Sequence, residues 1–198
     1  ETDEEPVQDI VEEEMKDYVD EIRRDEMQNL VCVLNPDSDV KIMLSAHADE
    51  IGLMISNIRE DGRLQVIDRG GIVPATYPGQ QVRIRTSNGE VYGVVEAYRN
   101  LFKEEKLETR HFLIDIGAKD REDALKYVNL GDPIVRDTHI RKLANGKFTA
   151  RALDDRLGVY IIMEAMKRAK ERGCKAGVYG ASTCLLYTSP SPRDPKTS

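Results

Sequence analysis

The sequence has few cysteines, no long apolar run and no excess of basic residues, and each shortage excludes a class of protein. Its three cysteines, Cys32, Cys174 and Cys184, lack zinc-site spacing and cannot all pair, which favours a reducing compartment. No apolar run approaches membrane-spanning length, and no basic segment followed by an apolar one opens the chain. The net charge of −7 disfavours nucleic acid, because phosphate binding needs clustered Lys and Arg. We therefore expect a cytoplasmic protein that binds neither membranes nor nucleic acid.

The residues that are present can build a folded core. The 198 residues suffice for one medium domain or for a domain with an insertion. Apolar residues make up 40% of the chain and charged residues 33%, which together predict a packed interior beneath an acidic surface. The chain begins Glu1-Thr2-Asp3 without an initiator Met, so we expect its start to be missing.

The first part of the chain has α/β character. Apolar residues follow helical spacing after Pro6, from Val7 as far as Ile22, and predict an amphipathic helix. Residues 29–33 predict a short strand, and residues 40–46 predict a buried strand that ends at His47. We assign residues 1–52 to the first part of an α/β domain.

The middle of the chain has a different pattern, in which short strands alternate with tight turns. Asp61-Gly62 and Asn88-Gly89 are hairpin signals, since type I′ turns need positive φ. This pattern predicts a compact β-barrel or sandwich over residues 53–138, with a short helix over residues 122–127. Residues 139–184 then return to a helix and a strand. The predicted fold is an α/β protein with a mixed sheet, interrupted by an inserted all-β barrel.

Two short runs carry the chemistry. The first is Ala46-His47-Ala48-Asp49-Glu50-Ile51-Gly52, at the end of a predicted strand, and the second is Ala152-Leu153-Asp154-Asp155-Arg156, at the start of a predicted helix. Residues two apart on an extended segment point to the same side, so His47 and Asp49 share a face. An imidazole and carboxylates are ligands for divalent metal ions, and a carboxylate can bridge two of them. Both runs are expected where strands meet helices, which is where open α/β sheets bind ligands.

Each run also has a simpler interpretation. A single His at the end of a strand is commonly an ordinary hydrogen-bonding residue. Asp154 and Asp155 suit the N-terminus of a helix, where Asp caps free N–H groups and complements the helix dipole. Arg156 can simply pair with a carboxylate. These alternatives remain open from the sequence alone.

Taken together, the two runs resemble the M42 family of metallo-aminopeptidases, also called the glutamyl or deblocking aminopeptidase type. The segments 112–118 and 131–135 resemble landmarks of that family within the insertion. The resemblance implies a zinc-peptidase α/β fold with a β-barrel dimerisation domain, and assembly into homo-oligomers, usually dodecamers. It further implies two divalent metal ions, zinc or cobalt, and the removal of N-terminal residues from peptides by metal-activated water.

The resemblance also assigns roles to three residues. His47 is implied as a terminal metal ligand, Asp154 as the bridging carboxylate, and Asp49 as the catalytic-site residue that orients His47. In the family a Glu-Glu pair follows a strand like the one predicted over residues 176–183, and it supplies the general base and a further ligand. Here Cys184-Leu185-Leu186 stands at that place. We therefore expect the C-terminal half to be missing and the chain as written to be inactive.

The C-terminal residues do not resemble a folded segment. Residues 185–198 are rich in Ser and Pro, which is typical of a disordered linker. Residues 184–194 also resemble one translated reading frame of a transposase sequencing adapter, and we favour that non-native origin.

Two other functions remain for the chain as a whole. It could act as a non-catalytic assembly module, or as a cellulase or endoglucanase, a name sometimes given to members of this family.

Overall fold

The computed structural model describes residues 4–98, 101 and 106–185, and it divides into two compact units. The first unit consists of the residues up to Glu50 and those from Ala152 onward, and the second consists of Ile51–Arg151. Of the predicted tail, residues 185–198, all but Leu185 lie outside the described residues. Within the described part of the chain, none of the helices combines the length and the apolar composition that crossing a membrane requires.

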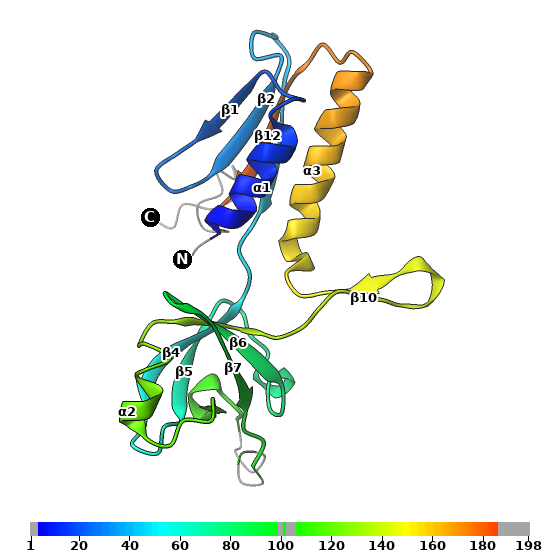
Figure 1. Ribbon diagram of the computed structural model, residues 1–198. Helices are drawn as coiled ribbons and strands as arrows, with labels where there is room; N and C mark the ends of the chain where they lie inside the picture. Colours follow the sequence, from blue (N-terminus) through cyan, green and yellow to red (C-terminus); the bar gives the residue numbers. More distant parts are fainter. Residues whose placement is uncertain (1–3, 99–100, 102–105, 186–198) are drawn as a thin grey trace. The chain divides into compact units, whose positions relative to one another are not determined.

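The first unit is a mixed four-stranded sheet with two long helices (Figure 1). The strand order is β1-β2-β12-β3. The central strand β12 runs parallel to β3 and antiparallel to β2, and β1 pairs antiparallel with β2. The elements of this unit are α1 (Glu5–Met15), β1 (Glu21–Arg24), β2 (Leu30–Leu34), β3 (Lys41–His47), α3 (Leu153–Glu171) and β12 (Gly177–Thr183).

The first helix is shorter than its apolar pattern predicts. Helix α1 ends at Met15, and Ile22 lies in β1, where it pairs with Cys32 of β2. Val19 and Ile22 continue the apolar pattern of the helix past Met15 because they pack on the same core as the buried face of α1. Pairing with β2 gives the segment Glu21–Arg24 ladder hydrogen bonds on one side, which outweighs the local helical pattern.

The strand that ends at His47 is an edge strand, whereas its apolar composition predicts a buried one. Among the described strands β3 pairs only with β12, and Ile42 and Met43 are about half exposed. By contrast, β12 is buried along nearly its whole length because it has a neighbour on each side. Composition alone does not distinguish a central strand from an edge strand, since both are rich in apolar residues.

The core of the first unit lies between the sheet and the two helices. Met15 of α1 and Met166 of α3 are fully buried there, together with Leu30 of β2. Fully burying one such side chain contributes about 1.5–3 kcal/mol. This core fixes the position of β3 and of the first turns of α3, which carry the two chemical motifs. Its remaining buried members are Val11, Cys32, Leu34, Ala46, Val159 and Val178.

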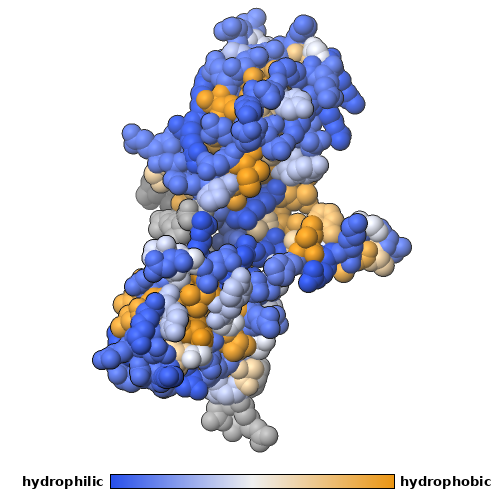
Figure 2. Space-filling view, viewed as in Figure 1, coloured by the Kyte–Doolittle hydropathy of each residue, from blue (hydrophilic) through white to orange (hydrophobic). Residues whose placement is uncertain are grey.

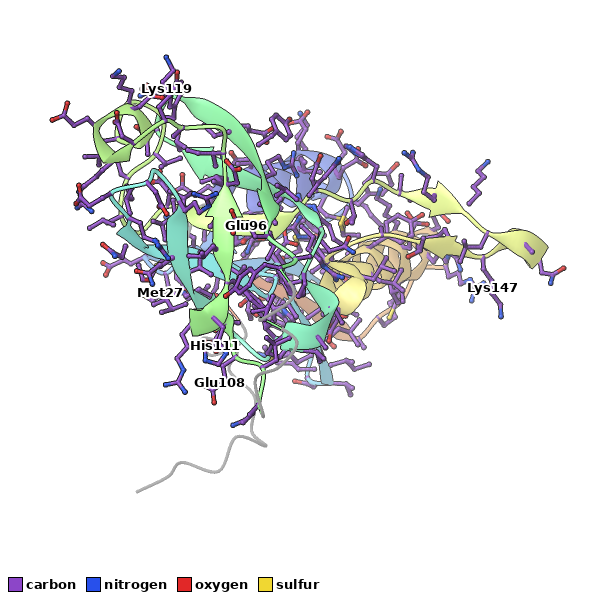
Figure 3. All side chains as sticks on the ribbon, turned by 90° about the horizontal axis from the view of Figure 1, so that it is seen from below. Met27, Glu96, Glu108, His111, Lys119 and Lys147 are labelled. Carbon is purple, nitrogen blue, oxygen red and sulfur yellow. The ribbon has the colours of Figure 1, made fainter. Side chains whose placement is uncertain are left out.

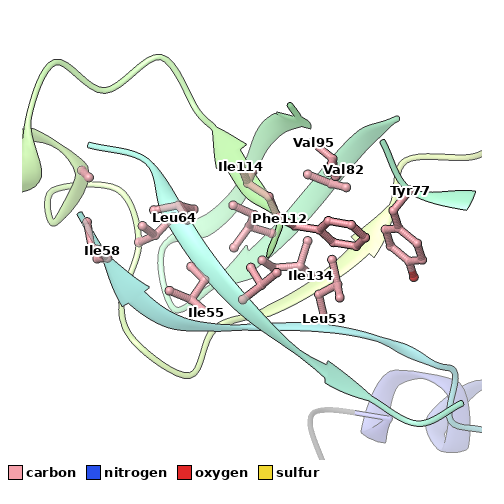
Figure 4. Packing of buried hydrophobic residues seen from close by; sticks show 14 of the residues in the cluster. Leu53, Ile55, Ile58, Leu64, Tyr77, Val82, Val95, Phe112, Ile114 and Ile134 are labelled. Carbon is pink, nitrogen blue, oxygen red and sulfur yellow. The ribbon is translucent and has the colours of Figure 1, made fainter. Parts of the chain in front are cut away.

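The second unit contains a closed six-stranded barrel, which confirms the predicted all-β insertion. The strands follow one another around the barrel in the order β4-β5-β8-β7-β6-β9. Phe112 and Tyr77 stack within its core, with ring centroids 6.0 Å apart (Figure 4). The barrel elements are β4 (Gly52–Ile58), β5 (Leu64–Arg69), η1 (Pro74–Thr76), β6 (Gln81–Thr86), β7 (Gly89–Val95), η3 (Thr109–His111), β8 (Leu113–Asp115), α2 (Arg121–Ala124) and β9 (Pro133–Arg136).

A small hairpin follows the barrel within the second unit. It consists of β10 (Arg141–Lys142), η4 (Ala144–Gly146) and β11 (Phe148–Thr149), and its two strands pair with each other. Lys147 lies on this projecting hairpin (Figure 3). The division by contacts groups residues 139–151 with the barrel. The functional boundaries after residues 52, 138 and 184 remain predictions, because compactness does not define which residues act together.

The surface is mostly hydrophilic, in keeping with the charged composition. On the face seen in Figure 2, hydrophilic side chains dominate and apolar ones gather in separate patches. In the first unit, exposed apolar side chains include Ile42 of β3 and Tyr160 and Ile161 of α3. Single exposed apolar residues are normal on protein surfaces.

Candidate metal centre

The candidate centre lies where two parallel strands end side by side. Thr183 of β12 pairs with His47 of β3, so both strands finish at the same edge of the sheet. One residue further, the backbone N–H of Ala48 donates to the carbonyl oxygen of Thr183 at 2.8 Å. Because parallel strands place their carboxyl ends together, His47 stands at the edge where open α/β sheets bind ligands.

The start of α3 separates the roles of its two aspartates. Oδ1 of Asp155 accepts a hydrogen bond from the backbone N–H of Gly158 at 3.0 Å, which is the contact of an N-cap residue. Asp154 makes no such bond, and its side chain is 97% exposed. Both residues have non-helical backbone angles, so the regular helix begins after them. The capping interpretation therefore applies to Asp155 and leaves the Asp154 carboxylate available.

The imidazole of His47 lies between two carboxylates. Its Nδ1 is 2.7 Å from Oδ1 of Asp49, and its Nε2 is 3.4 Å from Oδ1 of Asp154. The imidazole is largely buried, with 17% of the side chain exposed. The contact at Nδ1 has the distance of an ion pair, but the ring N–H is not aligned on the oxygen as in a hydrogen bond. The structure thus brings all three predicted site residues together, although the whole barrel separates Asp154 from the other two in the sequence.

The spacing of these atoms suits a shared metal ion. Two ligand atoms that each lie about 2.0–2.1 Å from a tetrahedral ion are about 3.3 Å apart. The observed 3.4 Å between Nε2 of His47 and Oδ1 of Asp154 is close to that value. Among the described residues, no group of three or more His, Cys, Asp or Glu side chains forms a potential metal cluster. The residues present therefore fit as two ligands of one ion.

A second polar cluster adjoins this one and includes Glu4, which the sequence did not place near the site. Arg156 donates from Nε to the carbonyl oxygen of Ala48 at 2.8 Å and from Nη2 to Oε2 of Glu4 at 2.7 Å. Oε1 of Glu50 lies 3.6 Å from the same Nη2. Burial raises the pKa of Glu4, while the guanidinium of Arg156 opposes that rise. Arg156 thus pairs with a carboxylate, as the simpler interpretation of its run predicts, but no local pattern points to Glu4, which lies far away in the sequence.

The other two histidines belong to the second unit. Nδ1 of His111 accepts a hydrogen bond from the backbone N–H of Glu108 at 3.3 Å, and the two residues lie together in Figure 3. His139 follows the barrel, and its side chain is 66% exposed.

Near the strand end of the first unit, the backbone N–H of Cys184 donates to Oδ1 of Asn29, and burial raises the pKa of the Cys184 thiol.

Comparison with known proteins places this chain in one family. Residues 28–185 match the family model for M42 glutamyl aminopeptidase. The lysyl aminopeptidase of Pyrococcus furiosus is 32% identical over 180 residues, which cover 87% of this chain and 51% of that protein. A putative aminopeptidase of Acetivibrio thermocellus is 37% identical over 170 residues, covering 85% of this chain and 49% of that protein. The chain belongs to the M42 glutamyl aminopeptidase family.

Solved structures agree with this assignment. The aminopeptidase APDkam598 of Desulfurococcus kamchatkensis superposes with a TM-score of 0.84 at 35% identity, covering 92% of this chain and 51% of that one. PhTET1-12s, described as a dodecamer, superposes with a TM-score of 0.80 at 32% identity, covering 92% and 55%. A protein of Thermotoga maritima described as an endoglucanase has a TM-score of 0.76 at 28% identity, covering 92% and 55%. The chain spans about half the length of the relatives that it matches.

Proposed function

We propose that this chain is the N-terminal, metal-binding part of a metal-dependent aminopeptidase. One observation gives the proposal its main support. In a chain of the M42 family, Nε2 of His47 and Oδ1 of Asp154 lie 3.4 Å apart at the carboxyl edge of the sheet. The family model supplies the reaction class, and this spacing supplies two ligands for a divalent ion.

The three predicted residues would have different tasks. His47 would hold one ion through Nε2, and Asp49, whose Oδ1 lies 2.7 Å from Nδ1, would orient the ring. Asp154, with its exposed carboxylate, would bridge two ions, which we propose are zinc or cobalt. Divalent ions bound in such a site lower the pKa of water and polarise a peptide carbonyl.

The described residues supply too few groups for catalysis. They bring together His47, Asp49 and Asp154, but Cys184 and Leu185 follow β12 where the family resemblance requires a general base and a further ligand. We propose that the remaining ligands and the base belong to a C-terminal half that this sequence does not contain, and that the chain as written does not hydrolyse peptides. Reading the gene beyond the codon for Thr183 tests this point. We expect a Glu-Glu continuation, and an uninterrupted native frame through Ser198 would contradict it.

The substrate and the assembly follow from the same family. We propose that the substrates are peptides with a free N-terminus. We also propose self-association through the barrel, because a similar solved structure is described as a dodecamer. An endoglucanase activity has less support. Glycosidases act through two carboxyl groups that flank the scissile bond, whereas here an imidazole lies between the carboxylates.

Metal titration tests the proposal on the chain itself. We expect Co²⁺ to bind and to give a visible absorption band that His47→Ala and Asp154→Ala each abolish. Asp155→Ala is the matched control, because that carboxylate caps the helix and we expect the band to persist. A chain that binds neither Co²⁺ nor Zn²⁺ but still self-associates would instead favour a non-catalytic assembly module. For the complete gene product, release of N-terminal residues from peptides, without release of sugars from cellulose, would separate the two enzyme classes.

A further inference from the structure

We propose that Arg156 is a positioning residue, whose guanidinium sets the distance between His47 and Asp154. This inference rests on the proposed metal binding. Arg156 stands two residues after Asp154, in the first regular turn of α3. Its Nε donates to the carbonyl oxygen of Ala48, the residue between His47 and Asp49. The side chain therefore joins the two segments that carry the candidate ligands.

The backbone at Ala48 is held from two sides. Its N–H donates to the carbonyl oxygen of Thr183 at 2.8 Å, and its carbonyl oxygen accepts from Nε of Arg156, also at 2.8 Å. Ala48 itself is fully buried. The first bond fixes the strand end to the sheet, and the second fixes it to α3. Without the second bond, the segment of His47 and Asp49 would be held less firmly against β12 and would lose this connection to the segment of Asp154.

Two carboxylates fix the guanidinium in turn. Nη2 of Arg156 lies 2.7 Å from Oε2 of Glu4 and 3.6 Å from Oε1 of Glu50, and both glutamates are only 12% exposed. Ion pairs that are shielded from water are weakened less by salt than surface pairs. Glu4 stands at the start of α1, so this cluster links three segments of the first unit. Residues that surround metal ligands without touching the metal keep those ligands in position. Losing one such residue typically weakens metal binding about 10–100-fold.

The chemistry of the cluster favours arginine over lysine. The planar guanidinium donates from Nε to the carbonyl and from Nη2 to the carboxylate at the same time. An ammonium group is a single point charge on a flexible stem, so it can neutralise Glu4 and Glu50 without also holding Ala48. A role in positioning therefore predicts that lysine does not replace Arg156, whereas a role in charge neutralisation alone predicts that it does.

The experiment compares Arg156→Lys and Arg156→Met in the full chain, with Arg168→Lys as a matched control. Arg168 lies on the same helix, its side chain is 68% exposed, and its Nη2 lies 3.9 Å from Oε2 of Glu164. Co²⁺ is titrated while the visible absorption spectrum is recorded, and the fold is checked by circular dichroism. Hydrogen exchange at the amide of Ala48, without metal, gives a second measurement that does not depend on binding.

We expect Arg156→Lys to bind Co²⁺ at least about tenfold more weakly. Its absorption band should change, and the amide of Ala48 should exchange faster. Arg168→Lys should match the native chain in all three measurements. Co²⁺ binding by Arg156→Lys with native affinity and spectrum would overturn the inference, as would a loss of fold in both Arg156 variants, since Arg156 would then act on stability alone. If the native chain itself gave no His47-dependent band, the proposed function would fail, and this inference with it.

Discussion

Asp155 accepts a hydrogen bond from the backbone N–H of Gly158 at 3.0 Å, while its neighbour Asp154 faces His47 at 3.4 Å. Two adjacent carboxylates thus have different surroundings, one serving the helix and the other available to a ligand. This difference can be measured with one pair of variants. Asp155→Ala should lower the free energy of unfolding by about 1 kcal/mol, because it removes a helix cap.

Asp154→Ala should leave the free energy of unfolding nearly unchanged but abolish metal binding. Its side chain is 97% exposed, so we expect a change in the free energy of unfolding within about 0.5 kcal/mol. The variant should nevertheless lose the Co²⁺ band, which Asp155→Ala should keep. Urea unfolding of the two variants checks the expected stabilities, and metal titration of the same proteins checks the expected Co²⁺ bands. If Asp154→Ala were the more destabilising variant, the assignment of the two carboxylates would be wrong.

The sequence predicts much of this arrangement because local rules govern it. The turns at Asp61-Gly62 and Asn88-Gly89 predict the hairpins of the barrel, since Gly62 adopts the positive φ of a tight turn. The end of an apolar strand correctly predicts where His47 stands. Features that depend on contacts between distant segments could not be predicted from the sequence. The end of α1 at Met15 is set by the pairing of β1 with β2, and the partners of Arg156 come from two other parts of the chain.

Gly158 offers a double-mutant cycle for the same cap. A Cβ atom built on Gly158 would lie 2.3 Å from Oδ1 of Asp155, so alanine there must displace the capping carboxylate. Alanine is also the better helix former by about 1 kcal/mol. In the native background, Gly158→Ala should therefore change stability little, because the lost cap offsets the gain. In the Asp155→Ala background, it should stabilise the protein by about 1 kcal/mol. Equal effects in the two backgrounds would contradict the contact.

Gln8 connects the first helix to the strand end beside the candidate centre. It is fully buried, and its Nε2 donates to the carbonyl oxygens of Ser182 at 2.9 Å and of Gln28 at 3.1 Å. Gln8→Ala leaves both carbonyls without this donor and opens space in the interior, so we expect a loss of about 2 kcal/mol in the free energy of unfolding. The exposed Gln80 is the control, and Gln80→Ala should stay within about 0.5 kcal/mol in urea unfolding. Equal effects of the two variants would refute the role of Gln8.

Cys32 predicts a dependence of stability on alkaline pH. Burial in the core of the first unit raises the pKa of its thiol from the ordinary 9.0 to about 11. Between these values the unfolded chain has released the thiol proton while the folded chain retains it. The unfolded state therefore binds fewer protons, and the free energy of unfolding falls as the pH rises from 9 to 11.

This contribution is fully present below pH 9.0, and its loss amounts to at most about 3 kcal/mol. Lysines and tyrosines also titrate in this interval, so the measured quantity is the difference between native protein and variant in urea unfolding at each pH. Cys32→Ala and Cys32→Val differ in volume but both lack the thiol. We expect both to show a shallower decline with pH than the native protein, whatever their stability at neutral pH. If both variants instead kept the native slope, the thiol of Cys32 would ionise alike in the folded and unfolded chain.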